Sequence, residues 1–398
     1  MNLANIRLLE LRNTYKWGGG PDKTILLSAE RHNRSRVEVV VAYIRDVSDQ
    51  EFRITEKAGD RGFTYYEITE RGKFDISVLR AIRDIVVRHN INLIHAHDFK
   101  SDLFAYLVRR WLWRRRIAVL STAHAWVILG PRGDLYRRLD LFLMKRFDHL
   151  IAVSDATRAE MTGAGISEEL ITVIHNGIDT DGWSPTRAES NLRHELGLEG
   201  AFPVIGYVGR IMPEKDLETW LRAVALVSRR FSDARFVLVG DGRDETTQRR
   251  LEELAESLGI REQTVFPGYR QHLLPVYSAF DIFFLSSRRE GLPNSLLEAM
   301  AMQLPVVTTD VAGAKELVVN NETGFVLPQG EAEQLGEAIL ALATDNELRL
   351  RMGRAGRERV EIEFCFNRRL RKIEDLYERL LGPVSNLTPQ SRRAESRL

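Results

Sequence analysis

The segment Val204-Ile-Gly-Tyr-Val-Gly-Arg-Ile-Met-Pro-Glu-Lys215 decides the fold class, because it joins an apolar run to a helical pattern through a short loop. The β-branched start predicts a buried strand that ends at Gly209. An apolar spacing near 3.6 residues then predicts a helix over Leu217–Ser228. A strand followed by a helix is the repeating unit of a parallel sheet, so this stretch indicates an α/β protein.

The same unit recurs along the whole chain. Predicted strands in the first half are Ile6–Leu11, Val37–Ile44, Leu93–His97, Ala118–Ser121, Leu150–Val153 and Ile171–His175. Those in the second half are Val204–Val208, Phe236–Val239, Thr264–Phe266, Ile282–Leu285, Pro305–Thr308 and Gly324–Leu327. Roughly six strands per half suffice for one doubly wound, Rossmann-like domain each. Two such domains face each other across a cleft, and ligands bind there at the carboxyl ends of the strands.

The loop-like stretch Gly177–Gly200 marks the expected boundary, with one short helical piece at Leu192–Leu198. We predict an N-terminal domain over residues 1–180 and a C-terminal domain over residues 181–362. The charged segment Arg351–Leu381 predicts one or two helices, with residues 363–382 forming the last helix. The polar tail, residues 383–398, is predicted to be disordered.

Composition excludes several classes of protein. The 398 residues carry 57 Lys+Arg and 56 Asp+Glu, a net charge of +1, which argues against a nucleic-acid binder. One cysteine, Cys365, excludes an intramolecular disulfide and any zinc site of several cysteines. The first apolar stretch contains Arg7 and Glu10, unlike a signal peptide, and no apolar run is long enough to span a membrane. We expect a soluble, cytoplasmic protein.

A dense basic run interrupts the first half of the chain. Five arginines fall within eight residues around two tryptophans: Arg109, Arg110, Trp111, Trp113, Arg114, Arg115 and Arg116. One interpretation is a solvated face with the tryptophans packed inward, which is the usual behaviour of charge runs. The other is contact with an anionic lipid or acceptor at the inner face of the cytoplasmic membrane. The basic helical pattern Leu135–Leu150 allows the same two interpretations.

Two loops could hold phosphate. Gly18, Gly19 and Gly20 follow the first strand, where glycines let backbone N–H groups approach an anion, although a simple tight turn explains them equally well. Arg210 and Lys215 follow a strand of the second half, where two cations suit a diphosphate. Taken alone, they could equally be solvated loop residues.

The segment Glu290-Gly-Leu-Pro-Asn-Ser-Leu-Leu-Glu298 is more specific. It places two glutamates eight residues apart, one before and one inside a helix that starts near Asn294. A carboxylate accepts hydrogen bonds from vicinal hydroxyls, as on a ribose or hexose, and the N–H groups at the helix start can bind phosphate or hydroxyls.

Together these segments resemble glycosyltransferase family 4, the retaining nucleotide-sugar transferases of the GT-B fold. The resemblance runs in the family's order from Gly18 to about residue 326. The matching segments are Gly18–Gly20, Ile94-His-Ala-His-Asp98, Ser121-Thr-Ala-His124, Ala152-Val-Ser-Asp155, Val173-Ile-His-Asn-Gly-Ile-Asp179, Val208–Lys215, Val239-Gly-Asp-Gly242 and Glu290–Met302. The pair of glutamates carries most of the specificity.

The resemblance implies a role for each residue of the candidate site. Arg210 and Lys215 would bind the donor diphosphate, Glu298 the ribose, and Glu290 the donor sugar near its reacting face. The backbone N–H groups of Gly291 and Leu292 would also serve the donor. From the first domain, His124 would lie beside the sugar, and Gly19 and Gly20 would close over the phosphates. The last helix would cross back onto the first domain.

The expected reaction is therefore sugar transfer, with retained configuration, from a nucleotide-diphosphate sugar to a glycan or lipid-linked acceptor. No cofactor and no metal are expected, because Asp179-Thr-Asp181 reads as a turn rather than as a metal motif. Two alternatives remain: a sugar-nucleotide epimerase of the same fold, and a non-catalytic subunit that binds sugar nucleotide. The stretch Gly20-Pro21-Asp22-Lys23 departs from the family, many of whose members have an acidic residue soon after the glycines.

Overall fold

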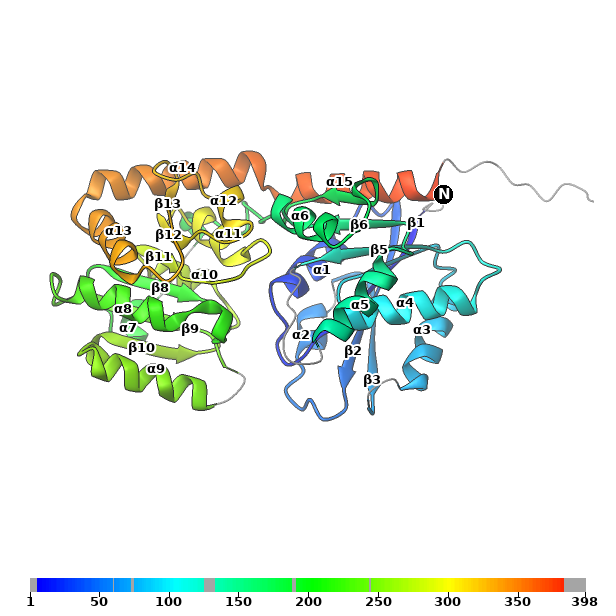
Figure 1. The fold of residues 1–398 in the computed structure, drawn as a ribbon, viewed down its shortest axis with the longest axis horizontal. Coiled ribbons are helices and arrows are strands. Elements are labelled where there is room, and N and C mark those ends of the chain that lie inside the picture. Colours follow the sequence, from blue (N-terminus) through cyan, green and yellow to red (C-terminus); the bar gives the residue numbers. More distant parts are fainter. Residues whose placement is uncertain are drawn as a thin grey trace, which may run out of the picture.

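The computed structural model describes residues 6–59, 61–72, 75–124, 133–187, 191–242 and 245–382. Within them the chain forms two parallel sheets, each covered by helices (Figure 1). The first sheet has seven strands in the order β3-β2-β1-β4-β5-β6-β7. The second has six, in the order β10-β9-β8-β11-β12-β13. The predicted pair of Rossmann-like α/β domains is confirmed.

The strands of the first sheet are β1 (Ile6–Asn13), β2 (Val37–Asp46), β3 (Thr64–Glu70), β4 (Leu93–Ala96), β5 (Ala118–Ala123), β6 (His149–Ala152) and β7 (Ile171–Val173). Those of the second are β8 (Val204–Val208), β9 (Arg235–Val239), β10 (Thr264–Gly268), β11 (Ile282–Leu285), β12 (Val306–Thr309) and β13 (Gly324–Leu327). The prediction missed β3, an edge strand in which the exposed polar residues Thr64, Glu67 and Thr69 interrupt the buried ones. The first half thus exceeds the expected six strands by one.

Helices connect the strands on both faces. The first domain contains α1 (Gly20–Arg31), α2 (Ile54–Ala58), α3 (Ile76–Arg88), α4 (Phe99–Trp111), α5 (Gly133–Met144) and α6 (Asp155–Gly163). After the boundary come α7 (Leu192–Glu195), α8 (Leu217–Ser228), α9 (Glu245–Ser257), α10 (Leu274–Ser278), α11 (Asn294–Ala301), α12 (Ala314–Leu317), α13 (Ala332–Thr344), α14 (Asn346–Glu363) and α15 (Phe366–Leu381). The basic pattern predicted to continue to Leu150 ends with α5 and is followed by β6.

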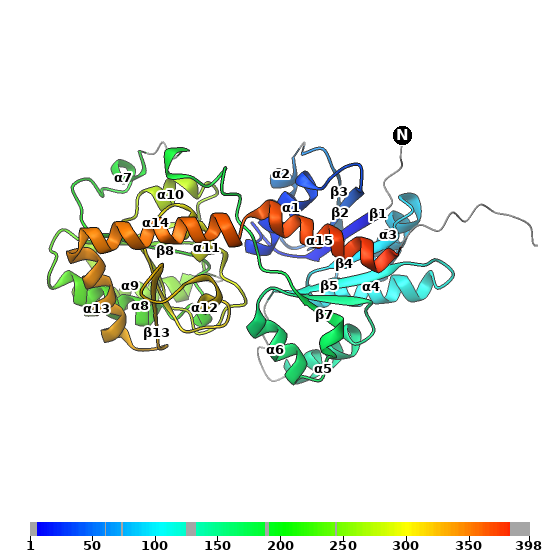
Figure 2. The same ribbon diagram turned by 90° about the horizontal axis from the view of Figure 1, so that it is seen from above.

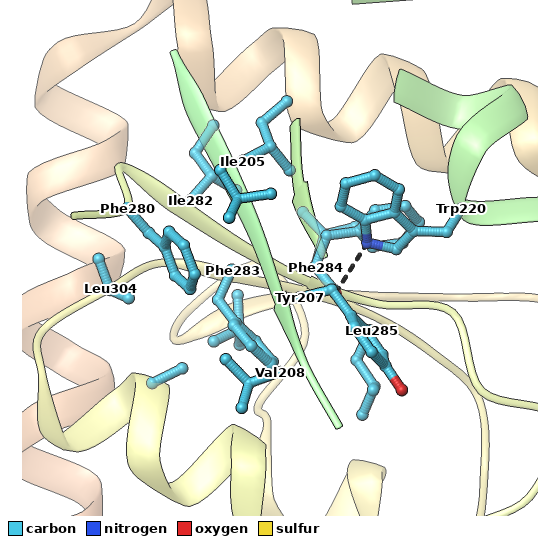
Figure 3. Packing of buried hydrophobic residues seen from close by; sticks show 14 of the residues in the cluster. Ile205, Tyr207, Val208, Trp220, Phe280, Ile282, Phe283, Phe284, Leu285 and Leu304 are labelled. Atoms are coloured by element: carbon cyan, nitrogen blue, oxygen red, sulfur yellow. Dashed lines mark hydrogen bonds between the residues drawn. The ribbon is translucent and has the colours of Figure 1, made fainter. Parts of the chain in front are cut away.

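The core of the second domain fixes the strands that carry the candidate site. Trp220 of α8 stacks on Phe284 of β11, with ring centroids 5.7 Å apart, and its Nε1 donates to the Phe284 carbonyl at 3.1 Å (Figure 3). Gly206 of β8 lies under Phe280, because a Cβ at Gly206 would come within 2.1 Å of that ring. These contacts hold β8 and β11 side by side, so the loops that follow them are neighbours.

The end of the chain returns to the first domain. Helix α14 lies along the second domain and α15 along the first (Figures 1 and 2). Between them, Phe366 N donates to Ile178 O at 2.9 Å, so this crossing pairs with the earlier one near Gly177. Helix α15 buries Ile373, Leu376 and Tyr377 in the core on one face of the first sheet. The tail, residues 383–398, whose disorder was predicted, lies outside the described residues.

Candidate active site between the two domains

The candidate residues occupy loops at the carboxyl ends of strands on both sides of the domain boundary. Arg210 and Lys215 follow β8, and Glu290 follows β11, with Glu298 inside the next helix, α11. From the first domain, the glycine loop follows β1 and His124 follows β5. This is the edge where ligands of open parallel sheets bind, so the fold alone brings these segments together.

The Lys215 ammonium and the Glu290 carboxylate form an ion pair. Lys215 Nζ lies 2.6 Å from Glu290 Oε1, and Ser287 Oγ donates to the same oxygen at 2.6 Å. Both charged side chains are largely buried, with exposed fractions of 15% and 11%. A partly buried ammonium requires a partner, and Glu290 provides it for Lys215.

Arg210 lies at a cavity between the domains. Its guanidinium Nη1 donates to the hydroxyl of Tyr15 at 3.3 Å, across the domain boundary. Burial works against the charge, but the contact with Tyr15 raises the pKa of Arg210. The cavity measures about 340 Å³ and is lined by Tyr15, Lys16, Arg210, Met212, Asp241 and Gly242. It is large enough for part of a nucleotide and presents the Arg210 cation to it.

Glu298 is buried and already paired. Tyr277 donates its hydroxyl to Glu298 Oε2 at 2.8 Å, and Lys23 Nζ lies 2.7 Å from Oε1. Lys23 comes from α1 of the first domain, so the predicted ribose contact is bridged across the cleft. Neither Tyr277 nor Lys23 was assigned a role from the sequence. Lys23 follows the glycine loop where the chain departs from the family pattern, and that departure was the available signal.

The glycine loop lies against the second domain. Gly19 N donates to the carboxylate of Asp22 at 2.6 Å, which folds the loop onto the start of α1. A Cβ at Gly20 would lie 2.6 Å from Asn294 Nδ2, at the first residue of α11. Asn176 Nδ2 in turn donates to Asn294 Oδ1 at 2.9 Å. In this structure the N–H group of Gly19 therefore serves Asp22, and Gly20 permits the close approach of the two domains.

His124 and Gly291 form another close contact between the domains. A Cβ at Gly291 would lie 1.8 Å from the His124 carbonyl oxygen, so only glycine permits the observed approach of the two domains. The neighbouring Leu292 is buried, and its carbonyl accepts from Asn176 Nδ2 at 3.4 Å. Burial holds the pKa of His124 well below its usual value, which keeps the imidazole neutral. The contact brings the backbone of His124 against the segment that carries Glu290.

Two known families match this chain, one in each half. The family described as Glycosyltransferase Family 4 matches residues 18–182, and Glycosyl transferases group 1 matches residues 189–359. The chain belongs to the group 1, family 4 glycosyltransferases. In this GT-B glycosyltransferase, the first domain matches Glycosyltransferase Family 4 and the second matches Glycosyl transferases group 1.

Individual relatives are similar to this glycosyltransferase over most of its length. N-acetyl-alpha-D-glucosaminyl L-malate synthase of Bacillus anthracis is 24% identical over 324 residues, 81% of this chain and 83% of that protein. UDP-Gal:alpha-D-GlcNAc-diphosphoundecaprenol alpha-1,3-galactosyltransferase of Escherichia coli is 24% identical over 311 residues, 76% of this chain and 79% of that protein. The structure of Anabaena HepE in complex with UDP and glucose superposes with a TM-score of 0.81 at 22% identity, covering 94% of this chain and 99% of HepE.

Two groups of ligand-type side chains lie near the cleft of the glycosyltransferase. Within the described ranges, the groups that could supply a metal with three ligands are Glu10 with His95 and His97, and Asp155 with His175 and Glu316. Both already form protein hydrogen bonds, for example His97 Nε2 to Glu10 at 2.5 Å and His175 Nε2 to Glu316 at 2.6 Å. Asp179, which was interpreted as a turn residue, accepts from both terminal nitrogens of Arg31, at 3.0 and 2.5 Å.

The basic run of the first domain is exposed. Trp113 is 68% exposed and Trp111 44%, so these side chains do not pack inward as one interpretation expected. Arg114 lies over the Trp113 ring at 5.0 Å. A hollow of about 490 Å³ beside them is lined by Tyr106, Arg109, Arg110, Trp113, Arg115, Arg116, Ile117, Ala118, Arg146, Asp148, Leu380 and Leu381. In the part of the chain that the structure describes, no helix is both long and apolar enough to span a membrane.

Proposed function

We propose that this glycosyltransferase moves a sugar, with retained anomeric configuration and without a metal ion, from a nucleotide-diphosphate sugar to a glycan or lipid-linked acceptor. The observation that carries the proposal is the convergence of Arg210, Lys215, Glu290 and Glu298 from one domain on the edge faced by His124 of the other. HepE, which shares the fold, was crystallised with UDP and glucose, and this supports a nucleotide-sugar donor.

The charges of the site suit a departing diphosphate. Breaking the bond between sugar and phosphate leaves negative charge on the phosphate oxygens and positive charge on the sugar. Arg210 and Lys215 provide two fixed cations for the phosphates, and such preorganised charges stabilise the transition state more than the ground state. Glu290, which holds Lys215, places a carboxylate near the sugar, where positive charge develops. Front-face attack by the acceptor, with its proton passing to the leaving phosphate, gives retention.

The two fixed cations provide the charge compensation that a divalent metal supplies in other transferases. We therefore infer a metal-independent reaction. The base of the donor is left to experiment, because the names of the relatives include both UDP and GDP sugars.

The acceptor side is proposed to operate at an anionic membrane surface, at its cytoplasmic face. The Escherichia coli relative is named for a diphosphoundecaprenol-linked acceptor, which supports a lipid-linked acceptor here. Exposed Trp111 and Trp113 among arginines combine interfacial aromatic rings with charge complementary to anionic headgroups. We expect the protein to sediment with vesicles containing phosphatidylglycerol and not with phosphatidylcholine vesicles, and Trp113→Ala with Arg116→Ala to reduce that binding. Equal binding to both kinds of vesicle would contradict the electrostatic contact.

The decisive experiment is nucleotide binding followed by turnover. Thermal unfolding is measured with UDP, GDP, ADP, dTDP and CMP, without metal and then with EDTA. Ligand at a hundredfold excess over Kd stabilises the native state by about 2.7 kcal/mol. We expect one nucleoside diphosphate to shift the transition, EDTA to have no effect, and Arg210→Ala to abolish the shift. Arg250→Ala, which changes an exposed side chain on α9 of the same domain, is the matched control.

A shift with none of the nucleotides, or one that requires metal, would overturn the donor assignment. With the binding nucleotide identified, its sugar derivatives are incubated with lipid-linked and soluble glycan acceptors. Transfer with retention supports the proposal. Release of an epimerised sugar without any acceptor would assign the epimerase alternative, and binding without turnover would assign the non-catalytic one.

A further inference from the structure

A chain of buried polar side chains runs behind His124. Glu10 lies in β1, and His97 and His124 directly follow β4 and β5, which are neighbouring strands of the first sheet. His97 Nε2 lies 2.5 Å from Glu10 Oε2, and His97 Nδ1 lies 3.2 Å from His124 Nε2. Glu10 and His97 are only 2% and 4% exposed. The three side chains therefore form a continuous hydrogen-bonded path from the sheet interior to His124, whose backbone meets the second domain.

The protonation states follow from the environment. Burial opposes charge on Glu10, yet His95 and His97 hold the pKa of its carboxyl well below the usual value. Burial and the neighbouring His95 lower the pKa of His97 to about 3, although the carboxylate favours its charged form. Glu10 is thus a carboxylate and His97 a neutral imidazole. A carboxylate can only accept, so the single proton of His97 is on Nε2.

The direction of the next hydrogen bond is then fixed. With its proton on Nε2, His97 presents a lone pair at Nδ1, so the bond to His124 must be donated by His124 Nε2. His124 is itself neutral, because burial, neighbouring His97 and His95, and the cations Arg12 and Arg369 all lower its pKa. Its remaining nitrogen, Nδ1, therefore carries a lone pair. That atom is buried and has no hydrogen-bond partner among the described residues.

A buried acceptor without a partner is costly, and such atoms often mark a ligand contact. We propose that Glu10 and His97 are positioning residues that hold His124 as its Nε2–H tautomer, so that Nδ1 accepts a hydrogen bond from a hydroxyl of the transferred sugar. This inference rests on the proposed function. Both imidazole dipoles in this row of side chains point their negative ends toward the sugar, where positive charge develops as the donor bond breaks. The effect is thus larger in the transition state than in the ground state.

The same carboxylate receives support from the returning C-terminal helix. Tyr377 of α15 donates its hydroxyl to Glu10 Oε1 at 3.3 Å, and His95 Nδ1 lies 2.7 Å from that hydroxyl. Thr122 Oγ1 lies 2.7 Å from the other ring nitrogen of His95. These contacts give His95, the other histidine of the Ile94–Asp98 segment, a role in supporting Glu10. They also give the crossing of α15 a consequence at the cleft.

The test compares two substitutions of His97. His97→Gln can keep the direction of both hydrogen bonds, because its amide N–H can donate to Glu10 and its carbonyl can accept from His124. His97→Phe keeps the ring volume and removes both bonds. We expect His97→Gln to retain kcat within about threefold and His97→Phe to lower kcat by roughly tenfold to a hundredfold, with KM for the donor changed less. Equal losses in both variants, or none in either, would overturn the inference.

A readout independent of turnover is the ¹⁵N spectrum of protein labelled at histidine. The His124 signals are assigned by their absence in His124→Gln. The inference requires a pyridine-type Nδ1 and a pyrrole-type Nε2 for His124 in the wild type and in His97→Gln, and the loss of that fixed pattern in His97→Phe. A pyrrole-type Nδ1 in the wild type would refute it. Nucleoside diphosphate binding is measured on all variants: its absence in the wild type would refute the proposed function instead.

Discussion

The substitution Gly291→Ala tests whether the observed approach of the two domains is the catalytic arrangement. The added Cβ would lie 1.8 Å from the His124 carbonyl oxygen, whereas real Cβ atoms essentially never come within 3.0 Å of another heavy atom. The contact must therefore lengthen by about 1.2 Å. The two atoms belong to different domains, so a small opening of the cleft relieves the clash without disturbing either core.

The expected cost follows from that displacement. A misplacement of about 1 Å costs roughly a hundredfold in rate, so kcat of Gly291→Ala should fall by about that factor. Arg210, Lys215 and Glu298 all lie in the second domain, so affinity for the nucleoside diphosphate should stay within about threefold. Thermal unfolding should be nearly unchanged, because opening relieves the clash.

The assay measures kcat, donor KM, nucleotide affinity and thermal unfolding on the same preparation. Gly163→Ala is the matched control: Gly163 ends α6, and an added Cβ would meet nothing within 4 Å. If Gly291→Ala kept kcat within twofold of the wild type, the approach of His124 to Gly291 would not belong to the active state. A large loss of thermal stability would refute the claim that the clash lies only between the domains.

Three further outcomes are expected. Lys23→Met should bind the nucleoside diphosphate about fivefold tighter in calorimetry, because ribose would no longer displace an ion pair with Glu298 worth ~1 kcal/mol; weaker binding would place Lys23 on the diphosphate instead. Burial raises the pKa of Glu316, but His175 and backbone N–H groups lower it more, so the pKa lies below its usual value of 4.5. The stability that the Glu316 carboxylate gives the fold is therefore present above that usual value and is lost as the pH falls through the lowered pKa. Glu316→Gln should therefore lower the free energy of unfolding in urea at pH 7 by ~1 kcal/mol and make that free energy fall less steeply as the pH is lowered. A pH dependence of unfolding like that of the wild type would contradict this. Glu290→Gln should lower kcat roughly a hundredfold in the transfer assay and also lower the temperature of thermal unfolding, because the largely buried Lys215 loses its carboxylate partner; a variant that keeps its kcat would remove Glu290 from the reaction.

The buried strands could be predicted from the sequence because each is a continuous apolar run. The predicted bounds of β8, β11 and β13 agree with the structure residue for residue. Strand β3 could not be found in this way, because Thr64–Glu70 forms an edge and carries polar residues on its exposed side. A continuous apolar run indicates a strand that is buried on both faces, and a half-exposed edge strand does not have such a run.

In the candidate site, residues within local motifs could be predicted, whereas contacts between distant segments could not. Motifs identified Lys215 and Glu290, and the structure pairs them. The partner of Glu298 could not be predicted, because Lys23 is 275 residues away and no local pattern records a contact across a cleft. Glu10 offered a weak signal that was used only to exclude a signal peptide: it is a charged residue flanked by Leu8, Leu9 and Leu11 in a buried strand. In a buried strand such a residue needs a partner, and here the partners are His97 and Tyr377.

The contacts between the domains fall into two groups with different consequences. Near the crossing, backbone bonds between Ile178 and Phe366 are independent of the candidate donor residues, so a hinge can form there without loss of the site. In the cleft, the contacts instead occupy the residues proposed to bind donor: Lys23 holds Glu298, and Tyr15 holds Arg210. A donor must therefore exchange polar partners at both positions, replacing an ammonium by ribose hydroxyls and a phenol by phosphate. Because those exchanges break bonds between the domains, donor entry is coupled to movement about the crossing, and Lys23→Met should ease both together.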